Sequence, residues 1–140
     1  MTKTFQNFIA GAWCDPASGE LFENRNPADT RDLIGRFPLS NAADVDRAVA
    51  SATRGFELWR RTPAPARGDV LRRVGDLLVK RKEELADLMT REMGKPLTET
   101  RGDVQEGIDT AYYAATIGRQ LSGTGPIRNA RSSFLYTRPS

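Results

Sequence analysis

The sequence predicts an α/β fold in which a β-rich beginning precedes a set of long helices. Before Ser40, apolar and polar positions alternate between turn-rich stretches, and this period of two is typical of short strands. From Ser40 the apolar period changes to 3.6 residues, which indicates amphipathic helices. The segment 133–137 (SFLYT) again has strand composition. We therefore expect a short β-hairpin and a strand, then three long helices and one terminal strand.

The strands are expected in the first forty residues. Residues 7–13 (NFIAGAW) and 20–25 (ELFENR) have strand composition, and the intervening 15–19 (DPASG) is rich in turn formers. This pattern predicts a hairpin with a five-residue loop. The NPAD stretch at 26–29 is interpreted as a break, after which a third strand is expected over 32–37 (DLIGRF).

The first helix is expected to begin at a cap supplied by Ser40 or Asn41 and to end near Arg61, because prolines follow. Its apolar positions recur on one face, as in an amphipathic helix. These positions are Val45, Ala48, Val49, Ala52, Phe56 and Trp59.

Two further helices follow. Thr62 is expected to cap the second, with Pro63 at its first position, and this helix should continue to residue 93. Its predicted buried positions are Val70, Val74, Leu77, Leu78, Leu85, Leu88 and Met89. The third helix is expected over 97–121, before the glycine-proline punctuation at 123–126. Its predicted buried positions are Val104, Ile108, Ala111 and Ala115.

The dipeptide Gly94-Lys95 raises the question of a nucleotide phosphate loop. Such a loop needs an earlier glycine and a hydroxyl after the lysine, whereas this sequence has Met89 and Pro96 at those positions. The segment before it also has the pattern of a helix, where a phosphate loop would follow a strand. The sequence therefore predicts a corner between two helices, with Gly94 in the left-handed conformation and Pro96 at the start of the next helix.

Composition excludes several classes of function. No stretch approaches the roughly 20 apolar residues of a membrane span, and no signal-peptide layout is present, so a cytoplasmic chain is expected. The 21 basic and 18 acidic residues are interspersed, which argues against nucleic-acid binding. Histidine is absent, which removes the usual metal-ligand sets and histidine-dependent catalysis. The single cysteine, Cys14, has Asp15 beside it, which disfavours a reactive thiolate.

The motifs together resemble the N-terminal segment of the aldehyde dehydrogenase superfamily. The resemblance runs from about residue 5 to residue 139. It is carried, in order and register, by NFIAGAW, ENRNPAD, DVDRAVASA, FELWRRTPAPAR, LLVKRKEELADLMTREMGKPLTETRGDVQEGID and YYAATIGRQLSG.

The resemblance implies oxidation of an aldehyde to a carboxylate with NAD or NADP as the hydride acceptor, through attack of a cysteine thiolate on the carbonyl. It also implies that the catalytic cysteine, the general-base glutamate, the oxyanion asparagine and the cofactor loop of the family lie beyond Ser140. No catalytic or cofactor-binding residue is therefore assigned here, and Cys14 does not match the motif of the catalytic cysteine. Residues 1–140 are expected to form a partial aldehyde dehydrogenase, its cofactor-domain segment, without a complete dinucleotide-binding domain or a catalytic domain.

Two sets of site residues follow from the resemblance. The third helix is implied to run along the mouth of the aldehyde channel, with Asp103, Glu106, Gly107 and Thr110 facing the channel. Some members of the family bind a structural monovalent cation through backbone carbonyls, at positions that match Asn24, Arg25 and Glu92.

Two hypotheses about function remain open from the sequence. The first is a portion of an NAD(P)-dependent aldehyde dehydrogenase that is inactive alone, and homo-oligomeric when complete. The second is a stand-alone helical interaction module derived from that scaffold. Because the terminal strand has no partner in the sequence, we expect the polypeptide to continue or a partner to supply the rest. The sequence does not decide whether this chain by itself is an enzyme, which aldehyde is used, or between NAD and NADP.

Overall fold

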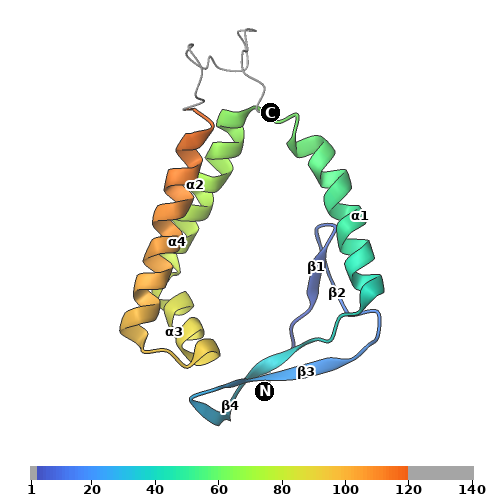
Figure 1. Cartoon of the computed structure of the whole chain (residues 1–140), viewed down its shortest axis with the longest axis vertical. Coiled ribbons are helices and arrows are strands. Elements are labelled where there is room, and N and C mark those ends of the chain that lie inside the picture. The colour runs from blue at the N-terminus through green and yellow to red at the C-terminus, as the bar shows by residue number, and fades with distance from the viewer. Residues whose placement is uncertain (1–2, 120–140) are drawn as a thin grey trace.

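The computed structural model describes residues 3–119, and the predicted strand at 133–137 lies outside these residues. The described part is α/β, as predicted, with four strands followed by four helices (Figure 1). The elements are β1 (Asn7–Ile9), β2 (Ala12–Cys14), β3 (Leu21–Asn26), β4 (Asp29–Pro38), α1 (Ala42–Trp59), α2 (Ala64–Lys80), α3 (Lys82–Met93) and α4 (Leu97–Ile117).

The strands form two antiparallel hairpins, and the predicted pairing of 7–13 with 20–25 is wrong. The NFIAGAW segment holds a hairpin of its own, in which β1 pairs with β2. Its two-residue turn is Ala10-Gly11, and both residues have positive φ, 55° and 80°. Positive φ at both central positions is what the tight turns that match strand twist require. Gly11 is the turn signal in this segment, and the predicted strand over 7–13 wrongly includes it.

The stretch predicted as a break, 26–29, is the turn of the second hairpin. The β3–β4 pairing runs from Leu21 opposite Pro38 to Asn26 opposite Asp29. The side-chain oxygen of Asn26 accepts a hydrogen bond from the N–H of Ala28 at 2.9 Å, a local bond that stabilises such turns. The third strand therefore begins at Asp29, three residues before the predicted start.

Helix α1 begins at Asn41, one of the two predicted caps. The Asn41 side chain accepts bonds from the N–H groups of Ala43 and Asp44, and Asp44 in return accepts the N–H of Asn41 at 3.0 Å. This reciprocal capping box satisfies donors that the first turn leaves free. Asp44 is only 2% exposed and also accepts the N–H of Ala17 at 3.0 Å, so it connects the loop before β3 to the start of the helix.

The predicted second helix is two helices. α2 ends and α3 begins at Arg81, whose φ of −110° and ψ of 14° leave the helical region. Lys80 lies in the last turn of α2, while Glu83 and Glu84 lie in the first turn of α3, where the helix dipole favours each sign of charge. The prediction missed this break because neither glycine nor proline marks it.

The start of α2 also differs from the prediction. Pro63 occupies the cap position itself, without a side-chain bond, so Thr62 does not cap this helix. Instead the Thr62 hydroxyl lies 3.2 Å from the carbonyl oxygen of Leu58 and donates to the end of α1.

The corner at Gly94 is confirmed. Gly94 has φ 69° and ψ 19°, the left-handed conformation, and Pro96 precedes the first residue of α4. Helix α4 ends at Ile117, before the predicted residue 121. Its predicted core positions Val104 and Ile108 are buried against Ala86 of α3. The partly buried side chains around them are Leu78, Leu85, Met89 and Leu97.

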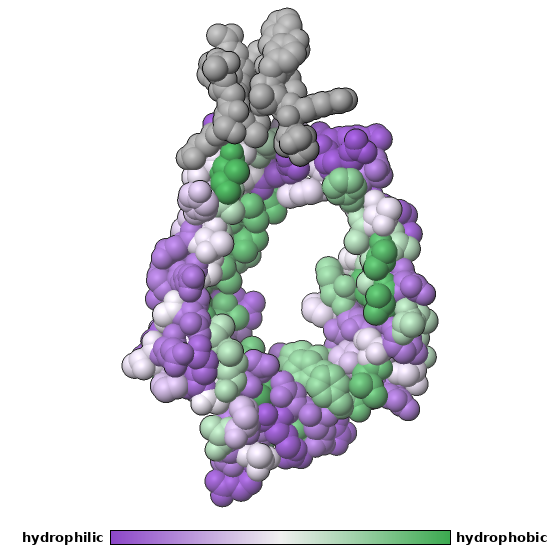
Figure 2. All heavy atoms as spheres, in the orientation of Figure 1, coloured by the Kyte–Doolittle hydropathy of each residue, from purple (hydrophilic) through white to green (hydrophobic). Residues whose placement is uncertain are grey.

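The predicted burial of the first part of α2 is wrong, and the apolar face of α1 is also exposed. Val49 of α1 is 58% exposed and Val74 of α2 is 41% exposed, although both lie on the apolar faces that the sequence predicts. Helices α2 and α4 lie side by side with α3 at one end, while α1 stands apart beside β1 and β2 (Figure 1). Figure 2 shows an opening between these two parts, with apolar surface on both sides. The amphipathic pattern therefore places the apolar faces of α1 and α2 correctly, and these faces are exposed in the described part of the chain.

Within residues 3–119, none of the helices is long and apolar enough to cross a membrane.

Candidate functional site on α4 and β3

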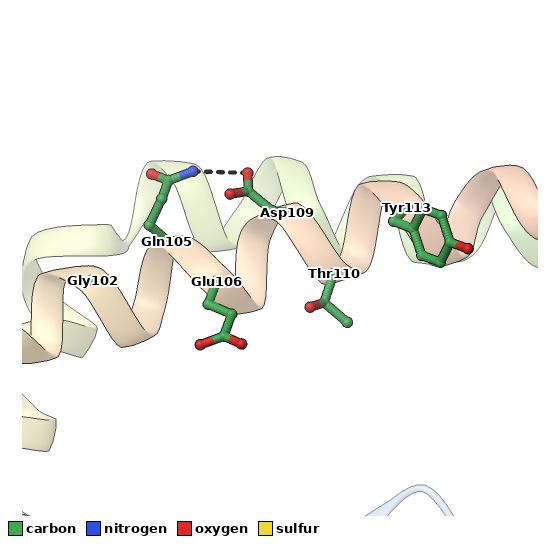
Figure 3. Close-up of a pocket in the computed structure, with 6 residues that line it drawn as sticks. All are labelled: Gly102, Gln105, Glu106, Asp109, Thr110 and Tyr113. Atoms are coloured by element: carbon green, nitrogen blue, oxygen red, sulfur yellow. Dashed lines mark hydrogen bonds between the residues drawn. The ribbon is translucent and has the colours of Figure 1, made fainter.

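The exposed side of α4 carries a shallow hollow formed within that one helix. It is lined by Gly102, Gln105, Glu106, Asp109, Thr110 and Tyr113 (Figure 3). Gln105 donates a hydrogen bond to Asp109 at 3.0 Å. Figure 3 shows Glu106 and Thr110 pointing to the other edge of the helix, away from that bonded pair. Two of the four predicted channel residues therefore share one exposed edge.

The other two predicted channel residues line a second hollow, where α4 meets α2 and α3. Asp103 and Gly107 contribute to it. Its remaining walls are mostly apolar and come from Leu78, Leu85, Leu88, Met89, Glu92, Met93 and Val104. The four residues thus follow one another along α4 but divide between two neighbouring hollows.

Asp103 is tied to the corner between α3 and α4. Lys95 Nζ lies 2.6 Å from Asp103 Oδ2 and 2.9 Å from Glu99 Oε1. These carboxylates raise the pKa of Lys95, and the hydrogen bond that Lys95 donates to Asp103 is the largest cause. The lysine of the GKP motif therefore holds the first turns of α4 against the corner.

The predicted cation positions lie where the β3–β4 ladder is irregular. Asn24 pairs with Gly35 and Arg25 with Leu33, so Ile34 is left as an extra residue in β4. Such a bulge interrupts the regular pattern in which backbone carbonyls accept hydrogen bonds from the neighbouring strand. The Arg25 guanidinium donates to Glu23 at 2.6 Å, so its charge is balanced by that carboxylate.

Glu92, the third predicted cation position, lies at the carboxyl end of α3, and α3 packs against β3. The residue four positions later is Pro96, which has no N–H, so the Glu92 carbonyl has no helical donor. The partial negative charge of a helix carboxyl end favours a nearby cation. Among residues 3–119, no three cysteine or carboxylate side chains come together as a metal cluster.

An ion pair that the sequence analysis missed joins α3 to the β3–β4 hairpin. Arg91 of α3 donates to both carboxylate oxygens of Asp32 in β4, at 2.9 and 2.7 Å. The guanidinium lowers the pKa of Asp32 below its ordinary value. The two residues are 59 positions apart, so no local spacing in the sequence signals the pair.

Comparison with known proteins decides the family. Residues 13–140 match the family model described as the aldehyde dehydrogenase family. The chain belongs to the aldehyde dehydrogenase family. The sequence-based assignment to the N-terminal segment of this superfamily is thereby confirmed, as is the fold class.

The similar aldehyde dehydrogenases include two curated relatives. An α-ketoglutarate semialdehyde dehydrogenase of Haloferax volcanii is 37% identical over 138 residues, which cover 99% of this chain and 29% of the relative. Malonate-semialdehyde dehydrogenase 2 of Bacillus mycoides is 42% identical over 142 residues, covering 98% of this chain and 29% of the relative. The chain thus spans less than a third of the length of these relatives.

Solved structures agree with this assignment. The chain superimposes on an NAD-dependent aldehyde dehydrogenase from Sinorhizobium meliloti with a TM-score of 0.82 and 32% identity, covering 89% of this chain and 25% of that one. It superimposes on a 3,6-anhydro-L-galactose dehydrogenase, solved in complex with NAP, with a TM-score of 0.81 and 29% identity, covering 91% of this chain and 27% of that one. The described helices and hairpins are therefore those of an aldehyde dehydrogenase.

Proposed function

We propose that this chain is the N-terminal portion of an NAD(P)-dependent aldehyde dehydrogenase that oxidises an aldehyde to a carboxylate through a cysteine thioester. The observation that supports this most is the family match over residues 13–140. NAD(P) would supply the hydride acceptor when bound, and we assign its binding to polypeptide outside this chain. The role of residues 1–140 is to build one side of the enzyme, as part of its cofactor domain.

In this proposal α4 forms part of the wall of the aldehyde channel. Glu106 and Thr110 are exposed on one edge of the helix, where an aldehyde could meet them. The ion pair between Asp103 and Lys95, at 2.6 Å, fixes the position of α4. Gly107 has no side chain, so the second hollow stays open at this position. None of these residues is given a step in the chemistry, and their contribution is the shape and charge of the channel mouth.

The same proposal includes a structural monovalent cation held by the carbonyls of Asn24, Arg25 and Glu92. The irregular ladder at β3 and the end of α3 without helical donors support it. We expect a bound cation to stabilise the contact between α3 and β3, and removal of the cation to weaken this contact.

We further propose a cytoplasmic, homo-oligomeric complete enzyme with an aldehyde substrate and no nucleic-acid partner. The interspersed charges support the absence of a nucleic-acid partner.

Activity tests the proposal directly. The 140-residue chain alone is expected to produce no NADH or NADPH from malonate semialdehyde, measured as absorbance with either cofactor. A chimera in which this chain replaces the matching segment of the Bacillus mycoides enzyme is expected to restore turnover, because the catalytic and cofactor residues then come from the relative. Turnover by the purified short chain, or a folded chimera without turnover, would contradict the proposal.

The cation is tested in the same chimera by its thermal unfolding midpoint. We expect a higher midpoint in potassium or sodium chloride than in choline chloride of equal ionic strength, because choline is too large for carbonyl coordination. Equal midpoints in all three salts would rule out the cation site.

A second candidate is the stand-alone helical interaction module, and the exposed apolar side chains of α1 and α2 favour it. The coding frame downstream of Ser140 discriminates between the two. A continuation that encodes the catalytic cysteine supports the dehydrogenase, whereas a stop codon supports the module.

A further inference from the structure

Acidic side chains line both hollows along α4, and within residues 3–119 no basic side chain lines either of them. The hollow formed within α4 has the carboxylates of Glu106 and Asp109. The hollow where α4 meets α2 and α3 has the carboxylates of Glu92 and Asp103. A substrate with a negative charge is therefore repelled along this flank of α4 unless a neighbouring cation offsets the carboxylates.

Lys95 is the cation that the structure places against this acidic flank. Its Nζ lies 2.6 Å from Asp103 Oδ2 and 2.9 Å from Glu99 Oε1, so one ammonium group bridges two carboxylates. The other three carboxylates that line the hollows form no ion pair with a basic residue of the described part of the chain. Asp103 is thus the lining carboxylate whose charge the described residues offset.

The corner between α3 and α4 holds Lys95 in this place. Gly94 ends α3 in the left-handed conformation, and a Cβ there would lie 3.0 Å from the side chain of Pro27. The side chain of Lys95 is 25% exposed and that of Asp103 is 37% exposed. Lys95 is not itself among the residues that line the second hollow, so its charge reaches the hollow through Asp103.

The charge of Lys95 is constant over the pH range of an enzyme assay. The two carboxylates raise the pKa of Lys95 above its ordinary 10.5. Interactions between partly exposed charges are screened by salt, however. The influence of Lys95 on a charged substrate should therefore be independent of pH near neutrality and should weaken as the ionic strength rises.

We propose that Lys95 is a specificity-determining residue of the channel mouth, where it offsets Asp103 and so lets aldehydes that carry a carboxylate approach α4. Without Lys95, the uncompensated charge of Asp103 would weaken the binding of anionic aldehydes relative to neutral ones of equal size. This inference rests on the proposed function, because it takes α4 as a wall of the aldehyde channel. A residue that only fixed the start of α4 would instead affect all aldehydes alike.

Two aldehydes of equal chain length test this charge effect in the chimera with the Bacillus mycoides enzyme. Malonate semialdehyde carries a carboxylate, and propanal has a methyl group in its place. Lys95→Met is expected to raise the KM for malonate semialdehyde about 5-fold relative to the KM for propanal, which is the size of one unit charge at short range in water. The kcat for both aldehydes is expected to stay unchanged, because the charge acts on substrate approach.

Asp103→Asn tests the same charge with Lys95 in place, and it is expected to lower the KM for malonate semialdehyde relative to propanal. The double variant of Lys95→Met with Asp103→Asn has the net charge of the parent, so its KM ratio should return to the parent value. Lys95→Arg keeps the charge and should keep the ratio. Arg54→Met removes one positive charge from an exposed position of α1, and as the matched control it should leave the ratio unchanged.

Ionic strength separates an effect of charge from an effect of shape. Raising choline chloride from about 0.01 M to about 1 M shortens the Debye length from about 30 Å to about 3 Å. The difference in KM ratio between Lys95→Met and the parent is expected to disappear over this range. Choline is used because it is too large to occupy the proposed cation site.

An equal rise in KM for both aldehydes, or a double variant no better than Lys95→Met, would overturn the inference, because Lys95 would then act on shape alone. If Lys95→Met does not fold, an unchanged KM ratio in Asp103→Asn overturns it. A parent chimera without turnover contradicts the proposed function and overturns this inference with it. An active parent chimera whose KM ratio is unchanged by both substitutions overturns this inference alone.

Discussion

Replacing Gly68 with alanine is expected to destabilise the chain by about 1–3 kcal/mol, the usual cost of overpacking. A Cβ at Gly68 would overlap the carbonyl oxygen of Ala115 in α4, and this neighbour is backbone, which cannot rotate away. At the end of α4, a Cβ at Gly118 would lie 2.6 Å from the carbonyl oxygen of Ala64. The two glycines therefore set the distance between α2 and α4, and a methyl group at Gly68 must push the helices apart.

The matched control is Gly55→Ala in α1. Gly55 also lies inside a helix, but a Cβ there would meet nothing within 4 Å. Alanine at such a position is expected to stabilise by about 0.5–1 kcal/mol, because glycine loses more conformational freedom on folding. Both variants are measured by urea unfolding followed by circular dichroism, in the 140-residue chain and in the chimera. A Gly68→Ala variant as stable as the parent would show that the helices separate at no cost.

The sequence predictions that proved correct depend on local patterns of residues. The cap at Asn41 and the corner at Gly94 each depend on residues within a few positions of one another, and the structure confirms both. The alternation and the 3.6-residue period located the apolar faces for the same reason. Such features are fixed by neighbouring residues and need no knowledge of the tertiary fold.

Predictions that needed distant partners failed or were absent. The predicted strand pairing was wrong because the predicted single hairpin and the two observed hairpins assign nearly the same residues to strands. Only the turn at Ala10-Gly11 distinguishes the two arrangements. The pair between Arg91 and Asp32 joins positions 59 residues apart. Burial of Val74 was predicted from its periodicity, but burial also requires a covering layer, and the described residues leave Val74 41% exposed.

Replacing Asp44 with alanine is expected to lower the thermal midpoint of the chain by several degrees. The Asp44 carboxylate accepts the N–H groups of Ala17 and Asn41 and pairs with Arg47 at 2.6 Å. Alanine would leave backbone donors without a partner at a site where Asp44 is 2% exposed, and unpaired buried donors are costly. Arg54→Ala, at an exposed position of the same helix, is the control and should leave the midpoint unchanged.

The contribution of Asp44 should also depend on pH. Its backbone hydrogen bond from Asn41 is the largest cause that lowers its pKa below the ordinary 3.8. A carboxyl with a lowered pKa in the folded state stabilises the fold above its unfolded pKa, and this stabilisation disappears as the pH falls through the folded pKa. The difference in urea midpoint between the parent and Asp44→Asn should therefore be constant near neutral pH and shrink below about pH 4. A difference that does not change down to the acid limit would show that the charge of Asp44 is not what holds the loop before β3 to α1.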